Sequence, residues 1–164
     1  MPTFATAVCL ARPVAEVFAF FLRPANHLLL VPPEVHVQLV HAPEQLYLGA
    51  RTTLQVRRWG LRRRVVREVT AFQADALLTD EQREGPFRRW VHQRRFEAWT
   101  ADGTRLTDTV EFEPPGGLLG LTLTTGFLLR DLEELFAYQA TQLFDRLARS
   151  AGDGEDGPVA GAPG

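Results

Sequence analysis

The chain has 164 residues, of which 45% are hydrophobic and 23% charged, and its formal net charge is −2. This length predicts one domain, which would bury roughly 70% of its unfolded surface and leave room for a pocket in its core. The composition excludes a disordered or fibrous chain, and the slightly acidic balance argues against a dedicated nucleic-acid binder.

The first part of the chain predicts a strand and two helices. Residues 3–10 alternate larger apolar and smaller side chains, which indicates a strand. A proline in the first turn opens a helix over residues 13–22, where apolar residues recur at helical spacing. A second short helix is expected over residues 24–30, because Pro32 and Pro33 cannot donate the backbone hydrogen bonds that would continue it.

Six further strands and one long helix follow. Short turns join most of the strands, so the sheet should be antiparallel and largely sequential. After a loop rich in proline and glycine, helical spacing of apolar residues predicts a helix from about Thr125 to Arg149. Together these elements make an α+β architecture. The expected strands cover residues 35–40, 48–59, 61–72, 77–84, 88–99 and 104–114.

The composition also predicts the limits of the domain and the cellular compartment. Residues 151–164 lack periodicity and cannot bury enough apolar area to offset their ordering entropy, so we expect one domain over residues 1–150 and a disordered tail. The single cysteine, Cys9, excludes an internal disulfide and is typical of a small core residue. No signal peptide and no apolar run near the roughly 20 residues of a membrane span are recognised. We therefore expect a cytoplasmic protein without integral membrane association.

Two consecutive strands place polar groups on apolar faces. Burying such groups without partners costs several kcal/mol, so the pattern predicts either a satisfied interior network or a polar-lined cavity. The residues that alternate in this way are Trp90, His92, Arg94 and Phe96 on the first strand and Leu106, Asp108, Val110 and Phe112 on the second.

The turn between these strands decides which side chains face each other. A two-residue turn formed by Asp102 and Gly103 would place the even-numbered apolar residues of one strand opposite odd-numbered residues of the other. The apolar side chains of the two strands would then lie on opposite faces of the sheet. A three-residue loop ending at Gly103, in the left-handed conformation, restores agreement. Asp108 then lies opposite Phe96 and diagonal to Arg94, and we expect an Arg94–Asp108 pair to satisfy both charges.

Several segments resemble the SRPBCC (START/Bet v 1-like, helix-grip) superfamily, over about residues 4–148. Within it, the chain is similar to a bacterial ligand-binding branch often labelled polyketide cyclase/dehydrase-like or cell-division-inhibitor-like. The resemblance implies a curved seven-stranded sheet that wraps around the C-terminal helix and encloses a mainly hydrophobic cavity. Such proteins bind lipids, sterols, polyketides or other apolar small molecules, and some are cyclases, hydrolases or co-chaperones. The segments are ARPVAEVFAFFLRPANHLLLVPP, GPFRRWVHQRRFE, GTRLTDTVEFEPPGGLLG and LLRDLEELFAYQATQL.

The alternation on two earlier strands extends the polar face. If these faces are concave, their polar side chains line the interior together with those of the later strands. With the apolar residues of the same faces and of the long helix, the expected ligand-binding residues are Arg67, Asp80, Gln82, Trp90, His92, Arg94, Phe96, Asp108, Phe112, Leu132 and Phe136.

Three interpretations of these residues remain open. They can form a buried network that fixes register, they can orient one end of an apolar ligand, or they can catalyse. Binding or transport of an apolar small molecule is the expected function, with His92 as the group that contacts the ligand. The alternative is a cofactor-independent cyclase or hydrolase in which His92 acts as a general base with Asp80 or Asp108. Covalent catalysis has no clear candidate, because this region contains no serine and no nucleophile elbow.

One departure from the branch bears on metals. The branch often has His-x-His where this chain has His92-Gln93-Arg94. One imidazole beside a fixed cation is a poor metal site, so neither a metal nor another cofactor is expected.

Five arginines surround a predicted hairpin tip at Trp59-Gly60. Such a cluster can contact phosphate groups, an anionic membrane surface or a protein partner. It can equally be a solvated edge whose arginine stems cover apolar surface. The five are Arg57, Arg58, Arg62, Arg63 and Arg64.

Overall fold

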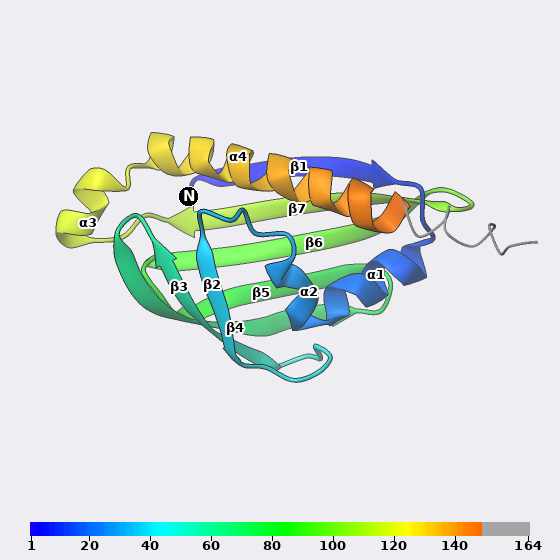
Figure 1. Ribbon diagram of the computed structural model, residues 1–164, viewed down its shortest axis with the longest axis horizontal. Coiled ribbons are helices and arrows are strands. Elements are labelled where there is room, and N and C mark those ends of the chain that lie inside the picture. The colour runs from blue at the N-terminus through cyan, green and yellow to red at the C-terminus, as the bar shows by residue number, and fades with distance from the viewer. Residues whose placement is uncertain (149–164) are drawn as a thin grey trace, which may run out of the picture.

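A computed structural model describes residues 1–148 and consists of a curved sheet with a long helix laid across it (Figure 1). The sheet order is β1-β7-β6-β5-β4-β3-β2, and every neighbouring pair is antiparallel. The predicted α+β class and seven-stranded sheet are therefore confirmed. The strands are β1 (Thr3–Leu10), β2 (His36–His41), β3 (Arg51–Arg58), β4 (Leu61–Gln73), β5 (Leu77–Glu84), β6 (Arg89–Thr100) and β7 (Gly103–Glu113), and the helices are α1 (Val14–Leu22), α2 (Pro24–Leu28), α3 (Gly117–Thr122) and α4 (Thr125–Leu143), followed by a π-helical segment (Phe144–Ala148).

Most element boundaries match the expected ones, with four differences. The expected long helix is α-helical only to Leu143 and continues as the π-helical segment. β3 begins at Arg51 rather than at residue 48, because left-handed Gly49 (φ 87°) turns the chain just before it. α2 ends at Leu28, two residues early. α3 was not predicted, since its leucines are largely exposed and give no amphipathic pattern. The expected tail and the last residue of the expected long helix lie outside the described residues.

α1 closes one end of the sheet. The carbonyl of Pro13 accepts hydrogen bonds from the first turn of the helix. Phe18 and Phe21 then pack against Phe96 of β6, with ring centroids 5.0 and 5.8 Å away. Edge contacts of this kind add about 0.5–1.5 kcal/mol to the stabilisation from burial. This aromatic cluster fixes α1 and the chain that leads into α2.

α4 lies along the same face of the sheet, with β1 beside it (Figure 1). Its N-terminus is capped by Thr124, whose hydroxyl accepts a hydrogen bond from the backbone N–H of Phe127 at 3.3 Å. The buried stripe is apolar except at Gln139, so one polar group faces the interior. The stripe consists of Leu128, Leu132, Phe136, Gln139 and Leu143.

The turn between β6 and β7 differs from the expected one. Thr100 pairs with Gly103, and the register shifts between Ala98 and Thr100, so a bulge rather than a three-residue loop brings the even-numbered faces together. The expected left-handed conformation of Gly103 was wrong. A Cβ at this position would lie 2.4 Å from the hydroxyl oxygen of Thr100, so a larger residue requires the Thr100 side chain to move. As a result, Asp108 lies directly opposite Arg94, and the expected pairing with Phe96 was also wrong.

Candidate functional site

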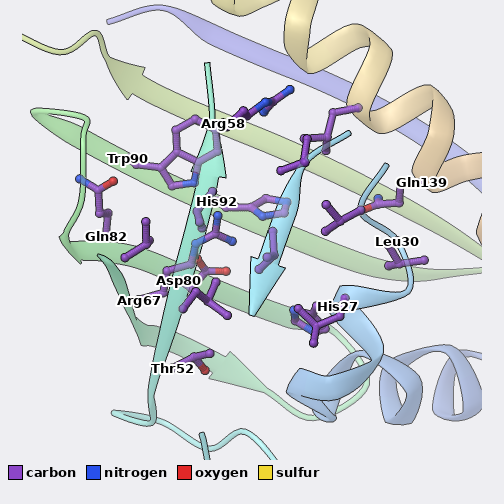
Figure 2. A pocket seen from close by; sticks show the side chains of 18 of the residues that line it. His27, Leu30, Thr52, Arg58, Arg67, Asp80, Gln82, Trp90, His92 and Gln139 are labelled. Carbon is purple, nitrogen blue, oxygen red and sulfur yellow. Dashed lines mark ion pairs between the residues drawn. The ribbon is translucent and has the colours of Figure 1, made fainter. Parts of the chain in front are cut away.

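A cavity of about 210 Å³ lies between α4, α2 and the inner face of β2 to β6. This is far more than the roughly 10–15 Å³ that one water molecule needs. Most of its wall is apolar, and Figure 2 shows polar side chains on the strands, at His27 of α2 and at Gln139 of α4. Apolar members of the wall include Leu30, Val37, Leu54, Val65, Leu132 and Phe136.

The expected site residues divide into two groups. Phe96, Asp108 and Phe112 do not line the cavity. Phe96 is covered by the α1 aromatics, Phe112 packs on Phe87 with ring centroids 6.3 Å apart, and Asp108 is 1% exposed behind the wall. The other eight all contribute to the wall: Arg67, Asp80, Gln82, Trp90, His92, Arg94, Leu132 and Phe136.

A hydrogen-bonded polar network forms one part of the wall, with Asp108 behind His92, Arg94 and Gln139. Oδ1 of Asp108 accepts hydrogen bonds from Nε2 of His92 at 2.7 Å and from Nε of Arg94 at 2.9 Å. Oδ2 of Asp108 accepts from the amide of Gln139 at 3.1 Å, and the Gln139 oxygen accepts from Nη2 of Arg94 at 3.2 Å. The expected Arg94–Asp108 pair is present, but His92 shares the same carboxylate and is not left alone to contact a ligand.

The charge of Asp108 is maintained by its neighbours. Burial raises the pKa of Asp108, but the charge of Arg94 and the hydrogen bonds from His92 and Arg94 outweigh it and hold the pKa below its ordinary value. The guanidinium of Arg94 also lies 4.3 Å from the ring centroid of Phe21. Asp108 is thus enclosed by protein, whereas Arg94 keeps one side toward the cavity.

A second set of polar atoms in the wall has no hydrogen-bond partner among the described residues. Nε of Arg67 and Oδ1 of Asp80 are buried and 4.0 Å apart, too far for a hydrogen bond. The indole N–H of Trp90 is also buried and unpaired among the described residues. Gln82 is already engaged, because its amide donates to the carbonyl oxygen of Phe87 at 2.7 Å. Buried polar groups are normally paired, and the three residues that carry these unpaired atoms all line the cavity (Figure 2).

Sequence reasoning missed His27 and Gln139, which both line the cavity. His27 donates from Nε2 to the carbonyl oxygen of Phe21 at 2.7 Å, which leaves Nδ1 as an acceptor. Burial, and to a lesser degree the positive charge of Arg94, lowers the pKa of His27 to about 3. The sequence could have identified both as cavity residues by the same pattern, a polar residue that interrupts an apolar helical stripe.

The tip of the β3–β4 hairpin contacts α4 at the other end of the cavity. Trp59 and Gly60 form a two-residue turn with φ values of 53° and 72°, both left-handed. Nη2 of Arg58 donates to Asp131 at 2.6 Å, and the Trp59 ring lies 6.5 Å from that of Phe127. Burial raises the pKa of Asp131, although the charge of Arg58 opposes this. Arg58 therefore belongs to the cavity wall rather than to an exposed cluster.

Known proteins resemble this chain in sequence and in fold. A family model described as polyketide cyclase / dehydrase and lipid transport matches residues 10–139. The uncharacterised protein MT0096 of Mycobacterium tuberculosis (strain CDC 1551 / Oshkosh) is 27% identical over 146 residues, or 87% of this chain. The chain spans 63% of the length of that relative.

Solved structures share the fold at low sequence identity. The Zhui aromatase/cyclase from Streptomyces sp. R1128 is 18% identical with a TM-score of 0.68, over 92% of this chain and 95% of that one. The major latex-like protein 151 from Panax ginseng is 12% identical with a TM-score of 0.64, over 89% and 97% respectively. Within residues 1–148, no helix combines the length and apolar character needed to cross a bilayer.

Proposed function

Because this chain belongs to the polyketide cyclase / dehydrase and lipid transport family, we propose that it binds an apolar small molecule of lipid, sterol or polyketide type in the cavity beneath α4. One observation carries the proposal: an apolar cavity whose wall holds three buried polar atoms without hydrogen-bond partners among the described residues, on Arg67, Asp80 and Trp90. An interior of this kind matches ligands with an apolar body and one polar end.

The polar atoms of the wall also restrict which chemical group the polar end of the ligand can carry. Arg67 and Trp90 offer N–H donors, whereas Asp80 offers an acceptor oxygen. A group that both accepts and donates, such as a hydroxyl or an enol, satisfies all three. Leaving a buried polar group unpaired costs about 1–3 kcal/mol, so a ligand without such a group is expected to bind more weakly.

Binding is tested with 1-naphthol, an aromatic body that carries one hydroxyl. We expect saturable binding by titration calorimetry, and Arg67→Met to weaken it about tenfold or more, because hydrogen bonds to charged groups contribute about 1.5–3 kcal/mol. Arg95→Met on the outer part of β6 is the matched control and should bind as the wild type does. Native mass spectrometry of protein purified from its source organism should show a bound small molecule. Repeated absence of any such mass, with no naphthol binding, would reject the proposal.

A second function, general-base catalysis, is favoured by the 2.7 Å contact between His92 and Asp108. Asp108 holds the imidazole with its Nε2 proton directed at the carboxylate, so Nδ1 is the basic atom. We expect the protein to accelerate exchange of the α-protons of 1-phenylbutane-1,3-dione in D2O, and His92→Asn to reduce this about 100-fold or more. Equal exchange rates with the wild type and the variant, measured by NMR, would reject general-base catalysis by His92.

A further inference from the structure

We propose that the end of the molecule formed by α3 and the β3–β4 turn binds the surface of an anionic lipid bilayer. The α3-hairpin surface consists of Arg57, Arg62, Arg63, Leu118 and Leu121, and none of them lines the cavity. The inference goes beyond cavity binding and stands on different residues, so the two can fail separately.

The apolar part of this surface is unusually exposed. Leu118 is 84% exposed and Leu121 is 75% exposed, although both lie on the same short helix. Between them, Leu119 packs into the cluster that contains Trp59 and Phe87. α3 is thus anchored through one leucine while it directs two others to solvent. Large apolar side chains that are exposed next to one another often mark an interaction site.

The basic part lies across the β3–β4 hairpin. Arg57 is directly opposite Arg62, and His36 of β2 is directly opposite Arg57. The like charges of Arg57 and Arg62 are destabilising in such a pair unless an anion compensates them. Arg57, Arg62 and Arg63 have no acidic partner among the described residues, whereas Arg64 lies 3.7 Å from Glu84. The uncompensated positive charge is therefore concentrated next to the turn.

The two parts are held together at one end of the molecule. Figure 1 shows α3 and the β3–β4 turn at the same end of the long axis. Trp59 of the turn contacts Phe127, which follows α3 closely in the chain and is itself 43% exposed. Apolar side chains that enter the interface, flanked by cations that bind headgroups, characterise peripheral membrane proteins.

An anionic bilayer accounts for both parts better than other partners do. A nucleic acid would use the arginines but leave the leucines in water. A second exposed apolar pair, Tyr47 and Leu48, lies near Arg51, but that arginine is already engaged by Glu68 at 2.7 Å. Unpaired positive charge and exposed leucines thus coincide at the α3-hairpin surface.

Vesicle flotation of the full chain tests the proposal. We expect binding to vesicles of phosphatidylcholine with phosphatidylglycerol, little binding to phosphatidylcholine alone, and weaker binding at high salt, because ions screen the headgroups. Arg57→Gln/Arg62→Gln should lower the partition coefficient about 25-fold, since each basic residue near the surface contributes about a factor of five. Leu118→Ser/Leu121→Ser should lower it about tenfold or more and preserve the salt dependence.

The matched control removes the same charge elsewhere. Arg95→Gln/Arg105→Gln, on β6 and β7, should bind vesicles like the wild type. An equal loss in this control would show that net charge alone is responsible and would overturn the proposal. So would retention of nucleic acid without vesicle binding, or no flotation with anionic vesicles at low salt. Binding of 1-naphthol should be unchanged in every variant, which separates this surface from the cavity and confirms that each variant is folded.

Discussion

Asp108→Ala is expected to lower the free energy of unfolding by about 3–5 kcal/mol, the effect of removing one partner from a buried ion pair. Arg94 is 7% exposed and would keep, among its contacts with the described residues, the hydrogen bond to Gln139 and the Phe21 ring. His92 would lose the acceptor of its Nε2 proton in the same step. Urea unfolding at pH 7, followed by tryptophan fluorescence, measures the change.

Two further variants make this result interpretable. Arg94→Met/Asp108→Asn removes both charges and is expected to be more stable than Asp108→Ala, because no buried charge is left uncompensated. Glu84→Ala breaks an exposed pair with Arg64 and should cost less than about 1 kcal/mol. A loss below 1 kcal/mol for Asp108→Ala would mean that water reaches Arg94 and that the network is not closed.

Acidification is expected to destabilise the protein through His27. The pKa of this residue is about 3 in the folded protein and near its ordinary value of 6.5 when unfolded. Between these values the unfolded chain binds a proton that the folded protein does not, so the stabilisation is complete above pH 6.5 and is lost as the pH falls toward 3. The full shift corresponds to about 5 kcal/mol, and the partial exposure of the ring makes this an upper bound.

His27→Gln isolates this effect, because glutamine can still donate to the Phe21 carbonyl but does not titrate in this range. Between pH 4 and 6, the free energy of unfolding should depend on pH less steeply in the variant, by up to about 1.4 kcal/mol per pH unit. Asp108 contributes mainly at lower pH, because its pKa is held below its ordinary value of 3.8. Parallel pH profiles for variant and wild type would contradict the assignment to His27.

The parts of the fold that follow from periodicity were predictable, and the parts that depend on packing were not. Alternation placed Trp90, Phe96 and Phe112 on inner faces, but only Trp90 lines the cavity. Whether a side chain on the inner face of the sheet reaches the cavity depends on which element covers it. Phe96 does not reach the cavity because α1 covers it. No residue pattern specified the bulge before Thr100, so the direct Arg94–Asp108 opposition was not foreseen.

The site showed the same division. The polar strand residues were found because they interrupt a period of two, whereas His27 and Gln139 come from helices whose apolar stripes they interrupt only once. A single interruption in a helix is equally consistent with a solvent-facing side chain. Only the placement of α2 and α4 over the sheet directs these two side chains into the cavity.

The contact between the β3–β4 tip and α4 has a kinetic consequence. To separate hairpin and helix, the protein must break the 2.6 Å Arg58–Asp131 hydrogen bond and the Trp59–Phe127 ring contact at the same time. Opening at this end is therefore opposed by both contacts together. For a molecule that leaves the cavity by this end, residence time is set by the frequency of that opening, and dissociation can be slow even when equilibrium affinity is modest.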